Sequence, residues 1–161
     1  MSGHTLWEKQ KSFSALLSFM EIVKIFWSGP YSIDSAIGKF TNYDDYGVYM
    51  ITRLWGKDSE TILWIGQVYW RCFGERLAEH KRYWLNDLRG EIRVRTGKIR
   101  LTGNRKISKK RVNDVETLLI NHGEPLENTQ KISRYYGREM KIKNLGRKGP
   151  LDTEICSKDY V

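Results

Sequence analysis

The chain has 161 residues and a mass of 19.0 kDa, and 40% of its residues are hydrophobic and 12% aromatic, with only three prolines. This composition is typical of one globular domain, and it excludes a disordered chain and a repeat array. Lys and Arg number 28 against 19 Asp and Glu, a formal charge of +9 that favours a polyanionic partner, either nucleic acid or an acidic membrane surface.

The cysteines and histidines lack the spacing of a disulfide framework or a zinc site. Cys72 and Cys156 stand far apart without a C-x-x-C partner, and the three histidines do not join them at metal-ligand spacing. Proteins without structural disulfides are typical of reducing compartments, so we expect an intracellular, cytoplasmic protein.

The first 45 residues are predicted to form an N-terminal helical extension. Large apolar side chains recur every three or four residues over residues 6–27, and Ser28, Gly29 and Pro30 end this helix. Its apolar face either packs on the main domain or forms a dimer interface. The charged residues Glu21 and Lys24 leave an uncharged run too short to span a membrane, so no membrane partner is expected. A connector follows over residues 31–45, with a short helix near residue 35.

The pattern changes to a period of two at residue 47, where a domain over residues 46–161 is expected to begin. Residues 47–52 and 61–68 are strand-like, and residues 55–59 have turn composition, which predicts a β-hairpin. A helix over residues 73–88 follows. Phe73, Leu77 and Trp84 form its apolar stripe, and Arg76 and His80 share one shoulder of that stripe.

Basic and apolar residues alternate over residues 91–102 on either side of Gly97. This alternation predicts a second hairpin with one basic face, within a basic insertion of about residues 89–111. A helix over residues 114–121 capped by Asn113, a short helix to about Tyr136 and a strand over residues 140–143 complete the predicted elements.

Several motifs follow one another in a fixed order along residues 47–128, about half of the chain. They are Gly47-Val48-Tyr49, Trp64-Ile65-Gly66, Arg76 with His80 four residues later, Glu116 on a helix, and Asn128. In this order they resemble the motifs of the GIY-YIG nuclease family. The resemblance implies an α/β (α+β) domain with a small central antiparallel sheet flanked by helices. It also implies hydrolysis of DNA phosphodiester bonds with one divalent ion, Mg²⁺ or Mn²⁺, in each active site.

The resemblance also implies a role for each motif residue. Tyr49 would hold or deprotonate the attacking water, Arg76 would bind the scissile phosphate, and His80 would assist proton transfer. Glu116 would bind the divalent cation and Asn128 would support the site. Trp64 stands at the position of the family's second tyrosine. An indole can neither act as a base nor accept a hydrogen bond, so this motif position departs from the family.

The chemistry of phosphodiester hydrolysis agrees with these residue types. The reaction requires a positioned water, positive charge near the phosphate oxygens and assistance to a poor leaving group. A guanidinium and a hard cation on a carboxylate supply the last two. Other interpretations remain open: Glu116 could close a capping box with Asn113, and Arg76 could pair with Asp87 or Glu79.

The basic insertion contains ten Lys and Arg and one acidic residue, and it lies between two predicted catalytic elements. We expect it to contact DNA phosphates and base edges. Its candidate DNA-binding residues are Arg93, Arg95, Lys98, Arg100, Asn104, Arg105, Lys106, Lys109, Lys110 and Arg111.

The leading hypothesis is therefore a sequence-specific, restriction-type endonuclease that cuts both strands of double-stranded DNA as a homodimer, or as a dimer formed on the DNA. In a chain without an obvious second domain, specificity would come from the basic hairpin and the N-terminal helix. A structure-specific repair or recombination nuclease and a non-catalytic DNA-binding module on a degenerate nuclease scaffold are the alternatives. A membrane-surface protein is the weakest hypothesis, because the N-terminal segment carries few cations.

Overall fold

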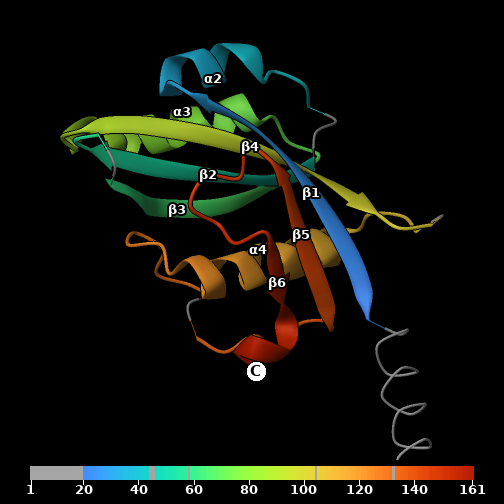
Figure 1. Ribbon diagram of the computed structural model, residues 1–161. Coiled ribbons are helices and arrows are strands. Elements are labelled where there is room, and N and C mark those ends of the chain that lie inside the picture. The colour runs from blue at the N-terminus through green and yellow to red at the C-terminus, as the bar shows by residue number, and fades with distance from the viewer. Residues whose placement is uncertain (1–19, 44–45, 58, 104, 132) are drawn as a thin grey trace, which may run out of the picture.

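The computed structural model describes residues 20–43, 46–57, 59–103, 105–131 and 133–161. These residues form an α+β domain with one six-stranded sheet in the order β3-β2-β4-β1-β5-β6 (Figure 1). The elements are β1 (Glu21–Tyr31), α2 (Ile33–Lys39), β2 (Tyr46–Trp55), β3 (Ser59–Tyr69), α3 (Phe73–Tyr83), η1 (Leu85–Asp87), β4 (Glu91–Leu101), α4 (Lys109–Gly123), β5 (Met140–Gly146), β6 (Glu154–Cys156) and η2 (Ser157–Tyr160).

The sheet is antiparallel except for one pair of strands. β2 and β3 form the predicted hairpin, and β4 pairs antiparallel with both β2 and β1. β1 and β5 run parallel, and β6 closes the sheet beside β5. The expected antiparallel sheet is therefore correct for most of its pairs. The short helix near residue 35 and the helix from Phe73 are also confirmed, although the latter ends at Tyr83.

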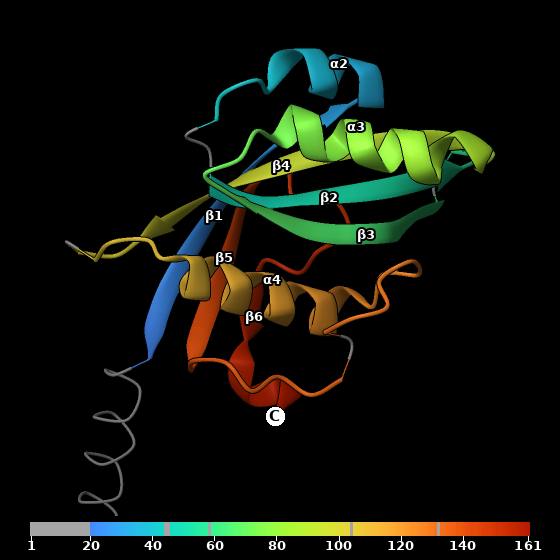
Figure 2. The same ribbon diagram turned by 180° about the vertical axis from the view of Figure 1, so that it is seen from behind.

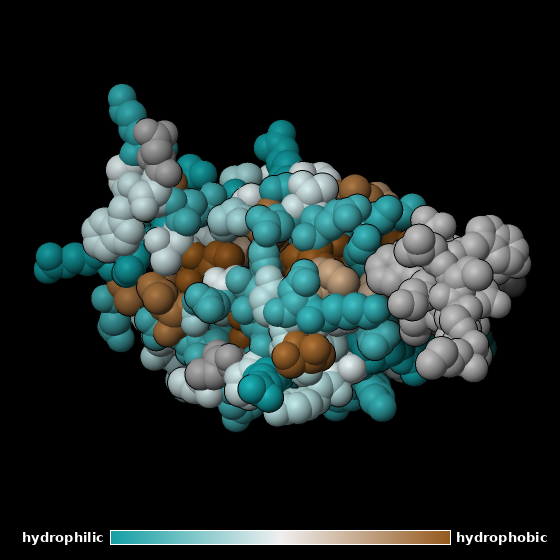
Figure 3. All heavy atoms as spheres, turned by 60° about the horizontal axis from the view of Figure 1, so that its bottom comes forward, coloured by the Kyte–Doolittle hydropathy of each residue, from teal (hydrophilic) through white to brown (hydrophobic). Residues whose placement is uncertain are grey.

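Two cores lie on opposite faces of the sheet. Val48 and Met50 of β2 point toward α4, whereas Tyr49 and Ile51 point toward α2 and α3, because successive residues of a strand face opposite sides. Figures 1 and 2 show α2 and α3 together on one side of the sheet and α4 on the other. In Figure 3 one face of the molecule is mostly hydrophilic, with apolar side chains in separate small patches.

The predicted N-terminal helix is wrong over its described part, because residues 21–31 form β1. Val23, Ile25 and Trp27 are buried, whereas Lys24 and Phe26 between them are exposed. β4 and β5 supply hydrogen-bonding partners on both sides, and this pairing overrides a spacing that also fits a helix. β1 thus lies inside the sheet rather than in an extension. Residues 6–19, with the proposed dimer interface, lie outside the described residues.

The predicted basic hairpin is also wrong, because β4 continues straight through Gly97. A Cβ atom at residue 97 would lie 2.6 Å from Ile25 Cγ2, so close packing requires the glycine here, and no turn forms. On a continuous strand Arg95 faces the opposite side from Lys98 and Arg100. The basic residues of this segment therefore do not share one face.

Arg95 is a structural residue, which corrects its assignment as a DNA contact. Its side chain is 6% exposed and lies on the α4 face of the sheet. The guanidinium forms an ion pair with Glu60, which also accepts a hydrogen bond of 2.6 Å from Thr52. A guanidinium held in this way is inaccessible to a DNA backbone.

The segment after β4 also differs from its prediction. α4 begins at Lys109, and its N-cap is Ser108, whose Oγ accepts a hydrogen bond of 3.2 Å from the Arg111 amide. Asn113 is therefore inside the helix, and the capping box with Glu116 does not form. Residues 124–131 and 133–139 are irregular, where a short helix to Tyr136 is expected from the sequence. Backbone hydrogen bonds to β3 and η2 hold this segment in a non-helical path.

Three arginines surround the buried carboxylate of Glu21, which is 3% exposed at the start of β1. The closest nitrogens of Arg105, Arg111 and Arg138 lie 3.7, 3.4 and 3.5 Å from its oxygens. Two candidate DNA-binding residues, Arg105 and Arg111, therefore neutralise an internal acid and connect β1 to the start of α4.

Of the helices formed by the described residues, none is long and apolar enough to cross a membrane.

Substitution of Glu60 by alanine tests the structural role of Arg95. The variant leaves a buried guanidinium without its carboxylate, so we expect the free energy of unfolding to fall by about 3 kcal/mol. Urea denaturation measures this change. Glu154→Ala is the matched control, because this carboxylate is 52% exposed beside Lys141 and Lys143, and its loss should cost less than about 1 kcal/mol. Equal losses in the two variants would contradict the structural role.

Candidate functional site

The candidate catalytic residues converge on the edge strand β3. Tyr49 of β2 is paired with Gly66 of β3, and its phenol lies across the glycine. A Cβ atom at residue 66 would lie 2.3 Å from Tyr49 Oη, so any larger residue would displace the hydroxyl. This contact connects the two motif tripeptides: one supplies the tyrosine and the other supplies the space for it.

Hydrogen bonds fix the protonation pattern around Tyr49. Tyr49 Oη lies 2.7 Å from His80 Nε2, and the Trp84 indole donates to His80 Nδ1 over 2.8 Å. Because Nδ1 accepts from Trp84, a neutral His80 carries its proton on Nε2 and donates it to Tyr49. His80 is therefore a hydrogen-bond donor to the phenol oxygen in its neutral form.

Burial dominates the electrostatics of both side chains. Burial and the nearby positive charge of Arg76 lower the pKa of His80 to about 4, so the ring is neutral at pH 7. Burial raises the pKa of Tyr49 to about 12, against the opposite effects of Arg76 and Trp64. Tyr49 is therefore a neutral phenol in this structure. Its hydroxyl proton is not used in their shared hydrogen bond, because His80 supplies that proton, but the side chain is fully buried, so no acceptor from solvent reaches it in this structure.

Trp64 packs against the same group from β3. Trp64 is the Cα partner of Ile51 and therefore lies on the α3 side, where its ring centroid is 4.9 Å from that of His80. The Trp64 indole nitrogen is buried and has no hydrogen-bond partner among the described residues. Trp64 thus restrains His80 by packing, and its N–H, although it forms no well-aligned hydrogen bond, lies close enough to Tyr49 to lower the pKa of the phenol.

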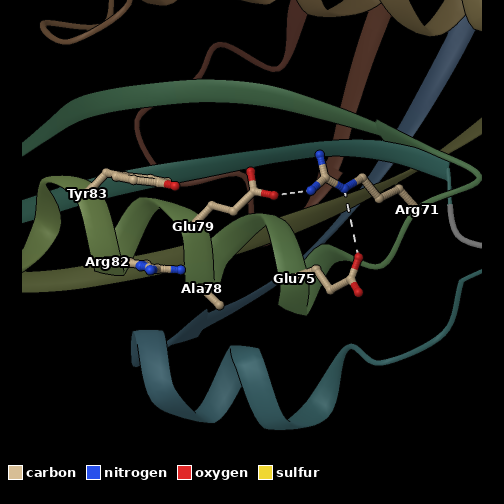
Figure 4. A pocket seen from close by; sticks show the side chains of 6 residues that line it. All are labelled: Arg71, Glu75, Ala78, Glu79, Arg82 and Tyr83. Atoms are coloured by element: carbon tan, nitrogen blue, oxygen red, sulfur yellow. Dashed lines mark hydrogen bonds and ion pairs between the residues drawn. The ribbon is translucent and has the colours of Figure 1, made fainter.

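Arg76 projects from α3 beside Tyr49 and is held by an acidic neighbour. Its guanidinium pairs with Glu79, and Glu79 also binds Arg71. Figure 4 shows Arg71 between Glu75 and Glu79. Arg71 lies in a hollow on the surface of α3. The hollow is lined by Arg71, Glu75, Ala78, Glu79, Arg82 and Tyr83. The Arg76 side chain is 35% exposed, so an incoming anion can compete with Glu79 for it.

Glu116 approaches β3 from the opposite face. Its carboxylate accepts a hydrogen bond of 3.1 Å from Gln67, the residue after Gly66, and forms an ion pair with Lys131. Lys131 also donates to Asn113 Oδ1 over 2.5 Å. The negative charge of Glu116 extends to Tyr49, where it raises the pKa of the phenol. Glu116 and Tyr49 thus flank one short segment of β3.

The oxygen atoms around Glu116 fit one hard divalent cation. Mg²⁺ prefers oxygen ligands and commonly uses one or two carboxylates together with water and substrate phosphates. Gln67 Oε1 is buried beside Glu116 without a hydrogen-bond partner among the described residues, and the Asn113 side-chain oxygen is nearby. Within the described ranges no group of three His, Cys, Asp or Glu residues could hold a metal. Glu116 would therefore be the one acidic ligand of a cation here, and in this structure the Lys131 ammonium is its counter-ion.

Asn128 holds the edge strand in place. Its side-chain oxygen accepts from the Ile65 amide over 2.9 Å, and its side-chain nitrogen donates to the Ile65 carbonyl over 3.0 Å. The neighbouring amides of Leu126 and Glu127 donate to Ile62 and Leu63. Asn128 thus fixes β3 directly before Gly66, which is consistent with the supporting role expected of it.

The candidate DNA-binding residues fall into different environments. Arg93 pairs with Glu91 at 3.3 Å, and Asn104 lies outside the described residues. The exposed members of the set are Lys98, Arg100, Arg105, Lys106, Lys109 and Lys110. Lys109 and Lys110 lie in the first turn of α4, where the helix dipole disfavours positive charge.

Sequence reasoning missed four residues of the site. Trp84 was placed in the apolar stripe, although its position four residues after His80 allows the two side chains to touch. Gln67 directly follows a motif glycine, and Asn113 precedes Glu116 by three residues on the same helix face. Lys131 lies in an irregular segment with no spacing signal, so only the folded structure brings it to Glu116.

Comparisons with known proteins provide no independent assignment. No protein-family model matches the chain, and no curated protein or solved structure matches it.

The state of His80 predicts a pH dependence of stability. Its pKa is about 4 in the folded protein and about 6.5 in the unfolded chain, so the unfolded chain binds the proton first as the pH falls. The contribution of neutral His80 to the free energy of unfolding should be fully present above pH 6.5. This free energy should fall by about 3 kcal/mol as the pH decreases to 4.

Urea denaturation between pH 4 and 7 tests this dependence against a His80→Phe variant, whose stability should change less over the same interval. Nitrogen NMR should show the proton of His80 on Nε2. Titration of His80 near pH 6.5 would contradict the prediction.

Proposed function

We propose that the protein is a metal-dependent DNA endonuclease of the GIY-YIG type that hydrolyses phosphodiester bonds at the β3 edge. One observation supports the proposal. Tyr49, with Arg76 beside it, lies against Gly66 on one face of β3, and Glu116 binds the adjacent residue Gln67 on the other face. A phosphate at this edge would meet the partly exposed guanidinium of Arg76 on one side and a cation held by Glu116 on the other. The Tyr49 hydroxyl is fully buried in this structure and would have to become accessible to the phosphate.

Each protein group has a definite part in this reaction. Arg76 would exchange Glu79 for a phosphate oxygen and neutralise its charge. Tyr49, whose oxygen accepts a hydrogen bond from His80 Nε2–H, would donate its own hydroxyl hydrogen bond to water or phosphate. Glu116 would hold the divalent cation, which would supply Lewis acidity to the phosphate and to the leaving oxygen. His80, held by Trp84, would stabilise negative charge that develops on the phenol oxygen.

Exposed cations supply the affinity for DNA in this proposal. Lys106, Lys109 and Lys110 precede or begin α4, close in sequence to Glu116. Cations at a helix N-terminus are unfavourable for stability, and a bound phosphate would make them favourable. Binding should therefore weaken steeply as the salt concentration rises.

Two modes of cleavage remain within this proposal. A restriction-type enzyme that cuts both strands of a palindrome requires two copies of the site, so it would act as a homodimer on double-stranded DNA. A structure-specific repair or recombination nuclease acts at one strand of a branched substrate and requires one copy.

A non-catalytic DNA-binding module is the second candidate, and one observation favours it. The Lys131 ammonium neutralises Glu116, and Lys131 has a left-handed backbone, φ 62°, that costs free energy in a residue with a Cβ atom. A nuclease must exchange this ammonium for a metal ion, whereas a binding module can retain it.

Substitution of Glu116 by glutamine tests the nuclease proposal. Removal of the one acidic metal ligand should lower the rate of plasmid cleavage in Mg²⁺ at least roughly 100-fold, while DNA affinity is retained. Gel electrophoresis measures cleavage and fluorescence anisotropy measures binding. Glu124→Gln, at the exposed C-terminal end of the same helix, is the control and should cut normally. DNA left intact by the unsubstituted protein with Mg²⁺ and Mn²⁺ would favour the binding module.

Substitution of Lys131 by methionine tests the exchange at Glu116. Without the competing ammonium, Mn²⁺ should bind about tenfold more tightly, a change of about 1.4 kcal/mol. Isothermal titration calorimetry measures this affinity without any need for cleavage. Lys106→Met, which removes an exposed ammonium away from Glu116, should leave Mn²⁺ affinity unchanged. Equal Mn²⁺ affinity in the two variants would indicate that the metal does not bind at Glu116.

A further inference from the structure

An uncovered strand face lies beside the candidate site. α2 and α3 pack over β2, β3 and the first half of β4, and in both ribbon views the far lengths of β1 and β5 extend away from these helices (Figures 1 and 2). We call this part of the face the strand platform. Its residues are Lys98 and Arg100 of β4 and Lys24 and Phe26 of β1, which are exposed, and Lys143 and Leu145 of β5, which are half-buried.

Strand register arranges the platform in two adjacent rows. Lys24 is the Cα partner of Arg100 on one side and of Lys143 on the other, so three cations lie in one line across three strands. In the next row Phe26 lies between Lys98 and Leu145. Side chains that oppose one another in register stand on the same face. The platform is thus a row of positive charge beside a row with an aromatic ring at its centre.

The platform is accessible and carries excess positive charge. Phe26 is 47% exposed, and Lys24, Lys98 and Arg100 are exposed without a carboxylate partner among the described residues. Glu154 lies 3.9 Å from Lys143, but it is 52% exposed and exchangeable. Phe26, on the middle strand β1, does not contribute to the core. Its neighbours Ile25 and Trp27 point to the opposite face and are buried there.

These features fit an unpaired DNA strand better than a duplex. The major groove of duplex DNA admits a helix or a two-stranded ribbon, whereas a sheet three strands wide presents a broad surface. Unpaired bases stack on exposed aromatic rings, and their phosphates follow neighbouring cations. The row with Phe26 can hold a base, and the row of cations can hold the backbone.

The platform lies on the same face of the sheet as Tyr49. Thr96 of β4 is the Cα partner of both Tyr49 and Ser28, and Lys98 and Phe26 stand one row further along the same face. From the spacing of strands and residues, the Cα atoms of Tyr49 and Phe26 are about 12 Å apart. Because α2 and α3 cover Tyr49 and Thr96, a single strand on the platform would reach the β3 edge around these helices rather than along the sheet face.

We propose that the strand platform binds an unpaired DNA strand, with one base stacked on Phe26 and phosphates on Lys24, Arg100 and Lys143. The inference deepens the nuclease proposal and rests on it for the choice of DNA. It specifies the substrate class as DNA in which a single strand adjoins a duplex. Such a substrate favours the structure-specific mode of cleavage over the palindromic one.

Fluorescence anisotropy in EDTA tests the platform without cleavage. The unsubstituted protein should bind a thymidine 20-mer, and a duplex with a single-stranded flap, more tightly than a blunt duplex of equal length. Phe26→Leu keeps an apolar side chain at an exposed position and removes the ring, so it should weaken single-strand binding roughly 5- to 100-fold. Its affinity for blunt duplex should change less than about twofold.

Two further variants separate stacking from charge. Lys24→Ala should reduce the slope of log affinity against log salt by about 0.7 on the 20-mer, the value for one lost phosphate contact. Trp55→Ala removes a half-exposed aromatic ring at the end of β2 that stacks on Arg53, so single-strand affinity should be unchanged. Quenching of 2-aminopurine in the 20-mer should be lost in Phe26→Leu and retained in Trp55→Ala.

The results distinguish this inference from the nuclease proposal. Preferential binding of blunt duplex, or equal single-strand affinity in Phe26→Leu and the unsubstituted protein, overturns the platform even if the protein cleaves DNA. Single-strand binding that depends on Phe26 supports the platform even if no DNA is cleaved, and in that case the nuclease proposal fails alone.

Discussion

The contact of the Tyr49 phenol with Gly66 is the constraint on which the candidate site depends. It requires a glycine on the edge strand, and it brings the hydroxyl to His80 and into the field of Arg76. The residue after this glycine, Gln67, faces the opposite side and binds Glu116. One strand pair therefore connects two helices that otherwise belong to separate cores.

Burial determines which chemistry these groups can perform. His80 remains neutral and donates to Tyr49, and Tyr49 keeps its proton because burial outweighs the charge of Arg76. A buried tyrosine with this pKa positions a water or a phosphate more readily than it accepts a proton. Trp64 fits this arrangement, because an indole donor and a packing surface are useful beside a phenol that acts through hydrogen bonds.

Local patterns predicted some parts of the protein and failed where distant strands decide the fold. The β2–β3 hairpin and α3 have regular apolar spacing and clear turn signals, and both elements form where the sequence predicts them. The structure places Tyr49, Arg76 and His80 side by side on these elements. The apolar residues of β1 fit a helix as well as a strand, and only pairing with β4 and β5 decides between them. Gly97 indicated a turn but serves close packing, and Lys131 gave no signal at all.

A crystal structure of the protein with Mn²⁺ and a flap duplex, protected from cleavage by a phosphorothioate, tests the central claim most directly. The account predicts a phosphate within hydrogen-bonding distance of Arg76 and of Tyr49 Oη at the β3 edge. It also predicts Mn²⁺ on Glu116 in place of the Lys131 ammonium. A phosphate distant from Gly66, with Lys131 still paired to Glu116, would contradict it.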